Sequence, residues 1–311
     1  MNMGNQNCRV VYGKTMVDLG KKNDRIVVLE ADLGKSTMTS FFQESFPERY
    51  FEMGIAEQNM LSTAAGLAIS GKIPFVNSFA VFSTGRVYDQ IRQSICLGKV
   101  NVKIIGSSCG LSDFSDGATH QGIEDMALMR ALPNMSVLAP ADGIETKKII
   151  EAAVDYIGPV YIRINRNDMP DMTDEHEKFT IGMPGVIQHG TDIAVFANGY
   201  MVWKALKAAK ILENEGISIK VVNVSSMKPV NEEAIKDLSK GLKGIITMEE
   251  HTVIGGLANI ITFILRGWAI PIESIGINDV FGQSATDYES LLDHYNLNES
   301  AVIRAAKKIL S

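Results

Sequence analysis

The stretch RYFEMGIAEQNMLSTAAGLAISGKIPFVNSFA, residues 49–80, contains the unit from which the fold can be predicted. Its apolar residues recur at helical spacing over 57–70, and the run IPFVNSFA at 73–80 is typical of a buried strand. A carboxylate, Glu57, stands at the head of the predicted helix. Because the helix dipole favours an acid in the first turn, Glu57 by itself indicates no function.

The same alternation of strands and helices runs outward from this unit through the whole chain. Further helices are predicted at 9–22, 83–97, 122–132, 143–156, 201–216, 231–240 and 255–268. Further strands are predicted at 25–32, 101–108, 136–142, 159–165, 192–199, 218–224, 244–250 and 272–277, and two helices close the chain. This order predicts an α/β protein with two domains, each a mainly parallel sheet flanked by helices.

One polar segment, RNDMPDMTDEHEKFTIGMPGVIQHG, interrupts the alternation and reads as a linker because of its prolines and charges. We therefore expect a first domain at 1–168, a linker at 169–188 and a second domain at 189–311. A length of 311 residues suits two domains of about 150 residues each.

The composition excludes several classes of protein. A net charge of -6 argues against a nucleic-acid partner. The three cysteines form no CxxC pair, which fits a reducing cytoplasm. The polar N-terminus does not resemble a signal peptide, and the longest apolar stretch, LANIITFILRGWAI, is too short to span a bilayer. We expect a cytoplasmic protein with no membrane partner.

Three loops at predicted strand ends are unusual: EADLGKST (30–37), SFAVFSTGR (78–86) and GSSCGLSDFSDGATHQG (106–122). In open α/β sheets, ligands bind at the carboxyl ends of strands. The third loop is long, rich in glycine and serine, and contains Asp113 and Asp116. Loops of this length inside a compact domain are often functional. Taken singly, the aromatic and polar residues of these loops are more often core or solvated residues.

Together, these segments resemble a known family. EMGIAEQNM, AAGLAISGKIPFVNSFAVF, YDQIR, DGATHQGIEDMALMRALPNMSVLAPADG and YIRINR resemble the pyrimidine-binding domain of transketolase. VVNVSSMKPV and MEEHTVIGGL resemble the transketolase C-terminal domain, so the resemblance covers essentially the whole chain in order. It implies a transferase that uses thiamine diphosphate to move a two-carbon ketol unit from a ketose, or its phosphate, to an aldose. Such enzymes serve carbohydrate metabolism, for example the pentose phosphate pathway.

The resemblance assigns cofactor-binding roles to four residues and a catalytic role to a fifth. Glu57, in the AEQN motif, is expected to be catalytic through a hydrogen bond to the pyrimidine ring. Phe79 and Phe82 are expected to pack around that ring, because aromatic contacts orient it without competing for its polar edge. Asp32 is expected to lie close to the cofactor, and His120 to be a second catalytic residue.

The resemblance also assigns substrate contacts. Asp116 and His120, in DGATHQ, resemble the pair that contacts the sugar hydroxyls and the reacting oxygen. Arg9, Ser36 and Arg166 resemble residues that hold a sugar phosphate. Arginine suits this role because its planar fork binds phosphate oxygens in pairs.

Two departures from the family pattern concern these sites. Transketolases usually carry a phosphate-binding histidine eight positions before the aspartate of DG, where this chain has Ser108. The aromatic loop also has one extra residue around Gly85, so no role is transferred to Arg86.

A third departure is the absence of the GDG motif through which the family binds diphosphate and Mg²⁺. We therefore expect no metal ligands on this chain. The expected protein is the C-terminal subunit of a split transketolase, inactive alone. Its partner would be an N-terminal subunit that carries the diphosphate and Mg²⁺ site, in an α2β2 assembly acting on sugar phosphates.

Three alternatives remain open on the sequence. A 1-deoxyxylulose-5-phosphate synthase shares THQG, although that family favours arginine where Cys109 stands. A β subunit of a 2-oxo-acid dehydrogenase would explain a two-chain design, but DGATHQ and YIRINR fit sugars better. The third alternative is a non-catalytic orphan half-site serving as a binding module.

Overall fold

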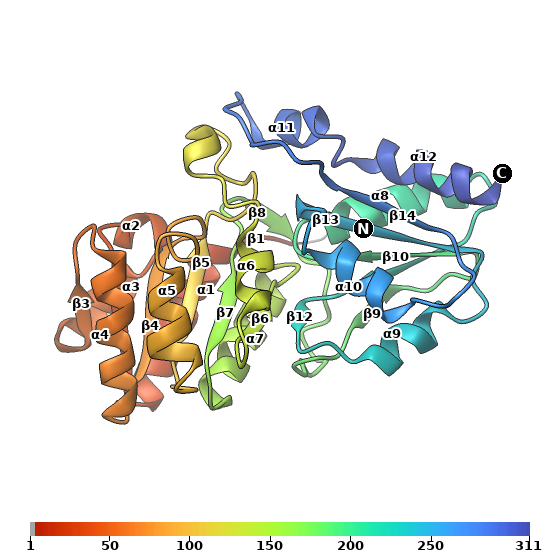
Figure 1. The fold of residues 1–311 in the computed structure, drawn as a ribbon. Coiled ribbons are helices and arrows are strands. Elements are labelled where there is room, and N and C mark those ends of the chain that lie inside the picture. The colour runs from red at the N-terminus through yellow and green to blue at the C-terminus, as the bar shows by residue number, and fades with distance from the viewer. Residues whose placement is uncertain (1–3) are drawn as a thin grey trace.

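Two mainly parallel α/β units lie side by side in the computed structural model, which describes residues 4–311 (Figure 1). One is built on a seven-stranded sheet of order β12-β6-β7-β5-β4-β2-β3, and the other on a five-stranded sheet of order β14-β13-β10-β11-β9. The predicted fold class is thus confirmed.

The seven-stranded sheet comes almost entirely from the first half of the chain. Its parallel strands are β2 (Ile26–Glu30), β3 (Tyr50–Glu52), β4 (Ile73–Phe79), β5 (Lys103–Ser107), β6 (Ser136–Leu138) and β7 (Val160–Arg163). Strands β4 and β5 are buried along their whole length, because helices cover both faces of the sheet.

The helices of this unit form two layers. One layer contains α1 (Cys8–Lys22), α3 (Ser40–Ser45) and α7 (Gly143–Asp155), in which α1 packs against both α3 and α7. On the other side, α4 (Glu57–Ile69) packs against α5 (Tyr88–Gln90) and η2 (Ile91–Cys96). The remaining helical segments are α2 (Gly34–Thr37), η1 (Pro47–Arg49), η3 (Gly117–Thr119) and α6 (Asp125–Ala131).

The second unit has its own sheet and helices. Its strands are β9 (Gly185–Gln188), β10 (Ile193–Ala197), β11 (Ile219–Asn223), β13 (Gly244–Thr252) and β14 (Ile272–Ile277), all parallel except β9. Its helices are α8 (Met201–Glu213), α9 (Glu232–Ser239), α10 (Leu257–Ile264), α11 (Tyr288–His294) and α12 (Glu299–Leu310). Helices α8 and α12 pack together, and α9 packs against α10.

The two units are joined by strands and by a buried polar network. Strand β12 (Ser226–Lys228) pairs antiparallel with β6, so the second half of the chain supplies the edge strand of the first sheet. At the boundary, Arg163 donates through Nη2 to the backbone oxygen of Glu250 at 2.8 Å and forms an ion pair with Asp125. The side chain of Glu250 accepts from Tyr288 Oη at 2.6 Å. Burial raises the pKa of Glu250 to about 7, with Arg163 opposing.

Several predicted elements differ from the structure. The predicted helix over 83–97 begins at Tyr88 and widens into the π-helical turn η2, where Leu97 N–H bonds to the Arg92 oxygen five residues back. The expected linker overlaps β8 (Asp168–Pro170), which pairs with β1 (Asn5–Asn7), and contains β9. The exact domain limits stay a prediction, and residues 1–3 of the first lie outside the described residues.

Parallel strands place the unusual loops at one edge of the first sheet. In the register, Phe79 lies opposite Ser107, Gly106 opposite Arg163, and Glu30 opposite Asn77. The loops that follow β2, β4, β5 and β7 therefore leave the sheet on the same side. None of the helices within residues 4–311 combines the length and the apolar character needed to cross a membrane.

Candidate functional site

Glu57 is a buried acid with an unused hydrogen-bonding atom. It is the first residue of α4, its exposed fraction is 4%, and its Oε2 finds no hydrogen-bond partner among the described residues. Arg86 Nη1 lies 3.9 Å from Oε2 but belongs to a side chain that is 56% exposed. An unpaired buried polar atom costs about 1–3 kcal/mol. Glu57 thus offers a hydrogen bond that folding does not use.

The turn before Glu57 is fixed by a second carboxylate. Glu52 Oε1 accepts from Gly54 N at 3.0 Å and from Asp32 N at 2.8 Å. Asp32 has a left-handed backbone (φ +60°) and an exposed side chain. The structure therefore ties the Asp32 turn to the segment that leads to Glu57, although only the backbone of Asp32 makes this contact.

Three rings gather at the carboxyl end of β4. The rings of Phe79 and Phe82 have centroids 6.3 Å apart and planes only 16° from parallel. His120 meets both rings edge-on, at 6.2 Å and 5.4 Å between centroids. Its Nδ1 lies 2.9 Å from the hydroxyl of Thr119. The predicted aromatic pair and the predicted catalytic histidine are thus brought into contact.

The loop that carries His120 is held by the second unit. Gln121 Nε2 donates to the backbone oxygens of Asp113 at 3.1 Å and Gln283 at 3.0 Å, and Ala285 N donates to Phe114 O at 2.8 Å. Figure 1 shows the yellow loop beside the blue segment that precedes α11. Sequence reasoning missed Gln121, because its contact partner lies 162 residues away.

A second cluster surrounds two arginines. Arg9 Nη1 donates to the backbone oxygen of Ser36 at 2.8 Å, and Arg166 Nη1 forms an ion pair with Asp113 Oδ2 at 2.6 Å. The guanidinium of Arg166 also lies 5.9 Å from the ring centre of Phe79. Burial and the nearby charge of Arg166 lower the pKa of Arg9. The arginine cluster is thus continuous with the aromatic rings.

Two predicted residues stand apart from these contacts. Asp116 is exposed just before η3, and among the described residues it makes no hydrogen bond to the ring of His120. Ser36 joins the cluster through its backbone oxygen, which accepts from Arg9. Asp113 was noted only as part of a long loop, yet it is the carboxylate that pairs with Arg166.

Glu30 anchors the loop that contains Ser36. Its Oε2 accepts from the hydroxyls of Thr37 at 2.7 Å and Thr39 at 2.6 Å, and its Oε1 accepts from Ala31 N at 3.1 Å. Burial raises the pKa of Glu30 from about 4.5 to about 7, against these three hydrogen bonds. The carboxyl therefore binds a proton more tightly in the folded chain than in the unfolded one.

This pKa shift predicts a pH-dependent stability. The contribution of Glu30 is fully present below pH 4.5 and is lost as the pH rises through 7, because the folded chain keeps the proton longer. In Glu30→Gln this loss is absent. The free energy of unfolding of the variant relative to the wild type should rise by up to about 3 kcal/mol between pH 4.5 and 8.

Chemical denaturation at a series of pH values measures this difference. The variant Glu44→Gln, on the exposed face of α3, reports the effect of the same chemical change at the surface. A constant difference between Glu30→Gln and the wild type across this pH range would contradict the prediction.

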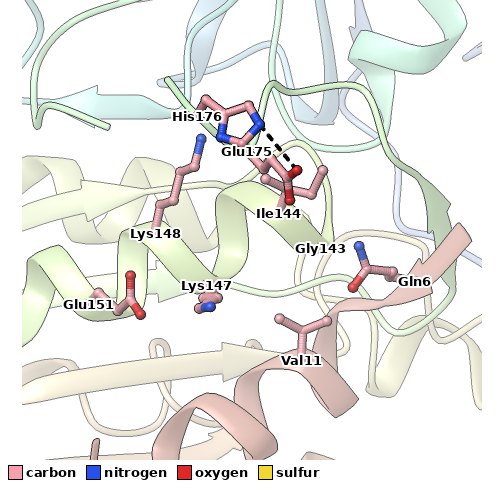
Figure 2. A pocket seen from close by; sticks show the side chains of 9 residues that line it. All are labelled: Gln6, Val11, Gly143, Ile144, Lys147, Lys148, Glu151, Glu175 and His176. Carbon is pink, nitrogen blue, oxygen red and sulfur yellow. Dashed lines mark ion pairs between the residues drawn. The ribbon is translucent and has the colours of Figure 1, made fainter. Parts of the chain in front are cut away.

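A surface hollow of about 390 Å³ lies elsewhere, between α1, α7 and the segment around Glu175 (Figure 2). Its lining includes Lys147 and Lys148 but none of the predicted site residues. Among residues 4–311, no group of three His, Cys, Asp or Glu side chains is arranged to hold a metal ion. The candidate site is therefore the strand edge that carries Glu57 and the aromatic rings.

The fold and this site define a class of protein: an α/β protein with a buried acid and two near-parallel phenyl rings at the carboxyl ends of its parallel strands. Family models agree with this reading. The model described as transketolase, pyrimidine binding domain, matches residues 5–172, and that described as transketolase, C-terminal domain, matches residues 185–302. The chain belongs to the transketolase family and comprises these two domains of it.

Similar proteins include subunits and split chains. A protein of Methanocaldococcus jannaschii, described as a transketolase C-terminal section, is 43% identical over 96% of this chain and 94% of its own length. A 6-deoxy-6-sulfo-D-fructose transketolase subunit from Clostridium sp. is 36% identical, over 97% and 94%. A solved split-gene transketolase, described as an inactive β4 tetramer, has a TM-score of 0.89 and 45% identity and covers 99% of both chains.

Proposed function

We propose that this chain is the C-terminal subunit of a two-chain transketolase that depends on thiamine diphosphate. A partner chain would carry the diphosphate-binding domain and the Mg²⁺ ligands. One observation is the main support for this proposal. Glu57 Oε2 is buried and has no hydrogen-bond partner among the described residues, and it lies at a sheet edge that bears two near-parallel phenyl rings.

These residues fit the pyrimidine end of the cofactor. Glu57 Oε2 would share a hydrogen bond with a ring nitrogen, and Phe79 and Phe82 would hold the ring by apolar contact. When bound, thiamine diphosphate supplies a carbon nucleophile for breaking and forming carbon–carbon bonds. The role of Glu57 is to favour the ring tautomer that receives a proton, and its burial keeps water from competing.

The remaining residues would orient the sugar. His120 stands against both phenyl rings, where its imidazole would donate to or accept from the reacting oxygen. Asp116 would bind a sugar hydroxyl. Arg9 and Arg166 would contact the end of the sugar that lies farthest from the reacting carbon. The bond between C2 and C3 of a ketose would break, and the rest of the ketose would leave as an aldose two carbons shorter, with its C3 hydroxyl losing a proton. The two transferred carbons would form a new bond to the aldehyde carbon of the acceptor aldose, whose oxygen takes up a proton. No net oxidation or reduction occurs.

A partner chain would also cover exposed apolar surface. Ile55, two residues before Glu57, is 73% exposed, and Phe51 is 37% exposed. Apolar side chains of this size beside an open site are typical of an interface. The inactive β4 assembly of the similar split-gene chain supports the idea that this subunit alone forms homo-oligomers without activity. With its partner, we expect an α2β2 tetramer.

Reconstitution tests the proposal. The chain alone and the chain mixed with a GDG-containing partner would be supplied with thiamine diphosphate, Mg²⁺, a ketose and ribose 5-phosphate, with both xylulose and xylulose 5-phosphate as donors. We expect ketol transfer only in the mixture. Ketol transfer by the chain alone would overturn the two-chain assignment.

Light scattering on the same samples tests the assembly. The chain alone is expected at four times its 34.0 kDa mass, and the mixture at the mass of two copies of each subunit. A fully active 1:1 heterodimer would show that the tetramer is not needed.

A further inference from the structure

We propose that Asp113 makes the far end of the sugar site selective for an uncharged, hydroxyl-bearing end group rather than for a phosphate dianion. The inference rests on the proposed ketol transfer for its substrate class. It concerns the end of the site at which Arg9 and Arg166 were expected to hold a phosphate.

The charges of the two arginines are balanced by nearby carboxylates. Arg166 is paired at 2.6 Å with Asp113, and the charges of Asp113 and Asp168 both act on Arg9. The formal charges of these four groups cancel. A phosphate monoester brings between about -1.5 and -2 at neutral pH, so it would enter a cluster with no surplus of positive charge.

Two buried polar atoms near the arginines, one acceptor and one donor, have no hydrogen-bond partner among the described residues. Asp113 Oδ1, an acceptor, and Arg9 Nε, a donor, are both buried and find no partner within residues 4–311. A sugar hydroxyl can donate to a carboxylate while its oxygen accepts from a guanidinium. A phosphate dianion has no hydrogen to donate and carries the same sign of charge as Asp113, so it satisfies only the arginine.

Asp113 is held in place beside Arg166 by burial and by hydrogen bonds of its loop. Its side chain is 1% exposed, and its backbone oxygen accepts from Gln121 Nε2. The adjacent Ser112 Oγ accepts from Arg166 N at 3.3 Å, which holds the two strand-end loops together. Burial raises the pKa of the Asp113 carboxyl, and the charge of Arg166 opposes this shift.

Ser108, at which this chain departs from the family pattern, also supports selectivity for an uncharged end group. Ser108, which stands in place of the expected phosphate-binding histidine, is fully buried with a left-handed backbone (φ +51°). Its Oγ also finds no partner in the described part of the chain. A hydroxyl can both donate and accept, but it adds no positive charge to the cluster.

Titration of the full chain with inorganic phosphate by calorimetry tests the role of Asp113 without any turnover. Asp113→Asn keeps the shape of the side chain and removes its charge, so we expect phosphate to bind at least tenfold more tightly than to the wild type. Asp18→Asn, on the exposed part of α1, is the matched control and should bind as the wild type does. Equal or weaker binding by Asp113→Asn would show that Asp113 orients Arg166 for phosphate, and would overturn the proposal.

A second measurement uses the wild-type protein and does not depend on the variant folding. In the reconstituted pair, kcat/KM is compared for xylulose and xylulose 5-phosphate, with glycolaldehyde as an acceptor that has no far end. We expect the wild type to use xylulose at least as well as xylulose 5-phosphate, and the phosphate ester to gain at least tenfold relative to xylulose in Asp113→Asn. Any wild-type preference for the phosphate ester would contradict this expectation and overturn the inference. If neither donor reacts, the proposed function fails, while the phosphate titration still decides the role of Asp113.

Discussion

Replacing Glu57 with alanine is expected to lower ketol transfer by the reconstituted pair about 10²–10³-fold or more, while the melting temperature stays the same or rises. The loss follows because a buried hydrogen bond made to a reacting group contributes this much to catalysis. The unchanged or higher stability follows because Oε2 accepts no hydrogen bond in the described residues, and its ion pair with the largely exposed Arg86 is 3.9 Å long, so the substitution removes a poorly compensated buried carboxyl. Steady-state kinetics and thermal unfolding on the same preparation measure both quantities.

Measuring activity and stability together separates a functional role of Glu57 from a structural one. If Glu57 only supported the fold, activity and stability would fall together. Glu48→Ala removes the same group from the exposed segment η1 and should change neither quantity. A Glu57→Ala enzyme that kept more than a tenth of the wild-type rate would exclude the assignment of Glu57 to the cofactor.

Replacing Asp125 with alanine is expected to cause the largest loss of stability. The carboxylate accepts from Tyr161 Oη at 2.6 Å and from Arg163 Nε at 3.0 Å, and both ionic side chains are almost fully buried. Removing it leaves a buried guanidinium without its counter-charge, which typically costs 3–5 kcal/mol. Because Arg163 also bonds to Glu250 in the second unit, the docking of the two units should weaken as well.

Chemical denaturation, with the slope of the transition recorded, measures this loss. Asp237→Ala breaks an exposed ion pair with Lys240 and should leave the free energy of unfolding nearly unchanged. The double variant Asp125→Leu with Arg163→Met replaces both charges by apolar groups and should recover part of the loss. A change of less than about 1 kcal/mol for Asp125→Ala would show that the pair is not important for stability.

The regular part of the fold could be predicted from the sequence because each element carries its own periodic pattern. The helix at 57–70 and the strand at 73–80 were located to within one residue, since a continuous apolar run and a helical period are local properties. The segment from 34 to 52, with α2, α3 and β3, was not predicted, because its elements are too short to show a period. The π-helical turn η2 has no such signal either.

The composition of the aromatic and acidic site could also be read from the sequence, through motifs that resemble a family. Glu57, Phe79, Phe82 and His120 are named by those motifs, and the structure places the two phenyl rings and the imidazole in contact. Their contact follows from the parallel pairing of β4 with β5, because the loops after these strands leave the sheet at the same edge. Their roles stay predictions until the cofactor is tested.

Only the tertiary structure decided which hydrogen-bond and ion-pair partners the site residues have. Glu57 Oε2 has an ion pair with Arg86 at 3.9 Å but accepts no hydrogen bond within residues 4–311, Asp113 pairs with Arg166, and Gln121 is held by Gln283; these facts concern partners 29 to 162 residues apart. A sequence pattern reports local geometry and average burial, whereas the pairing of a buried polar atom depends on every neighbour that packs around it. The sequence thus determined the two α/β sheets and the residue types at their edge, and packing determined which charges cancel and which atoms remain to bind a ligand.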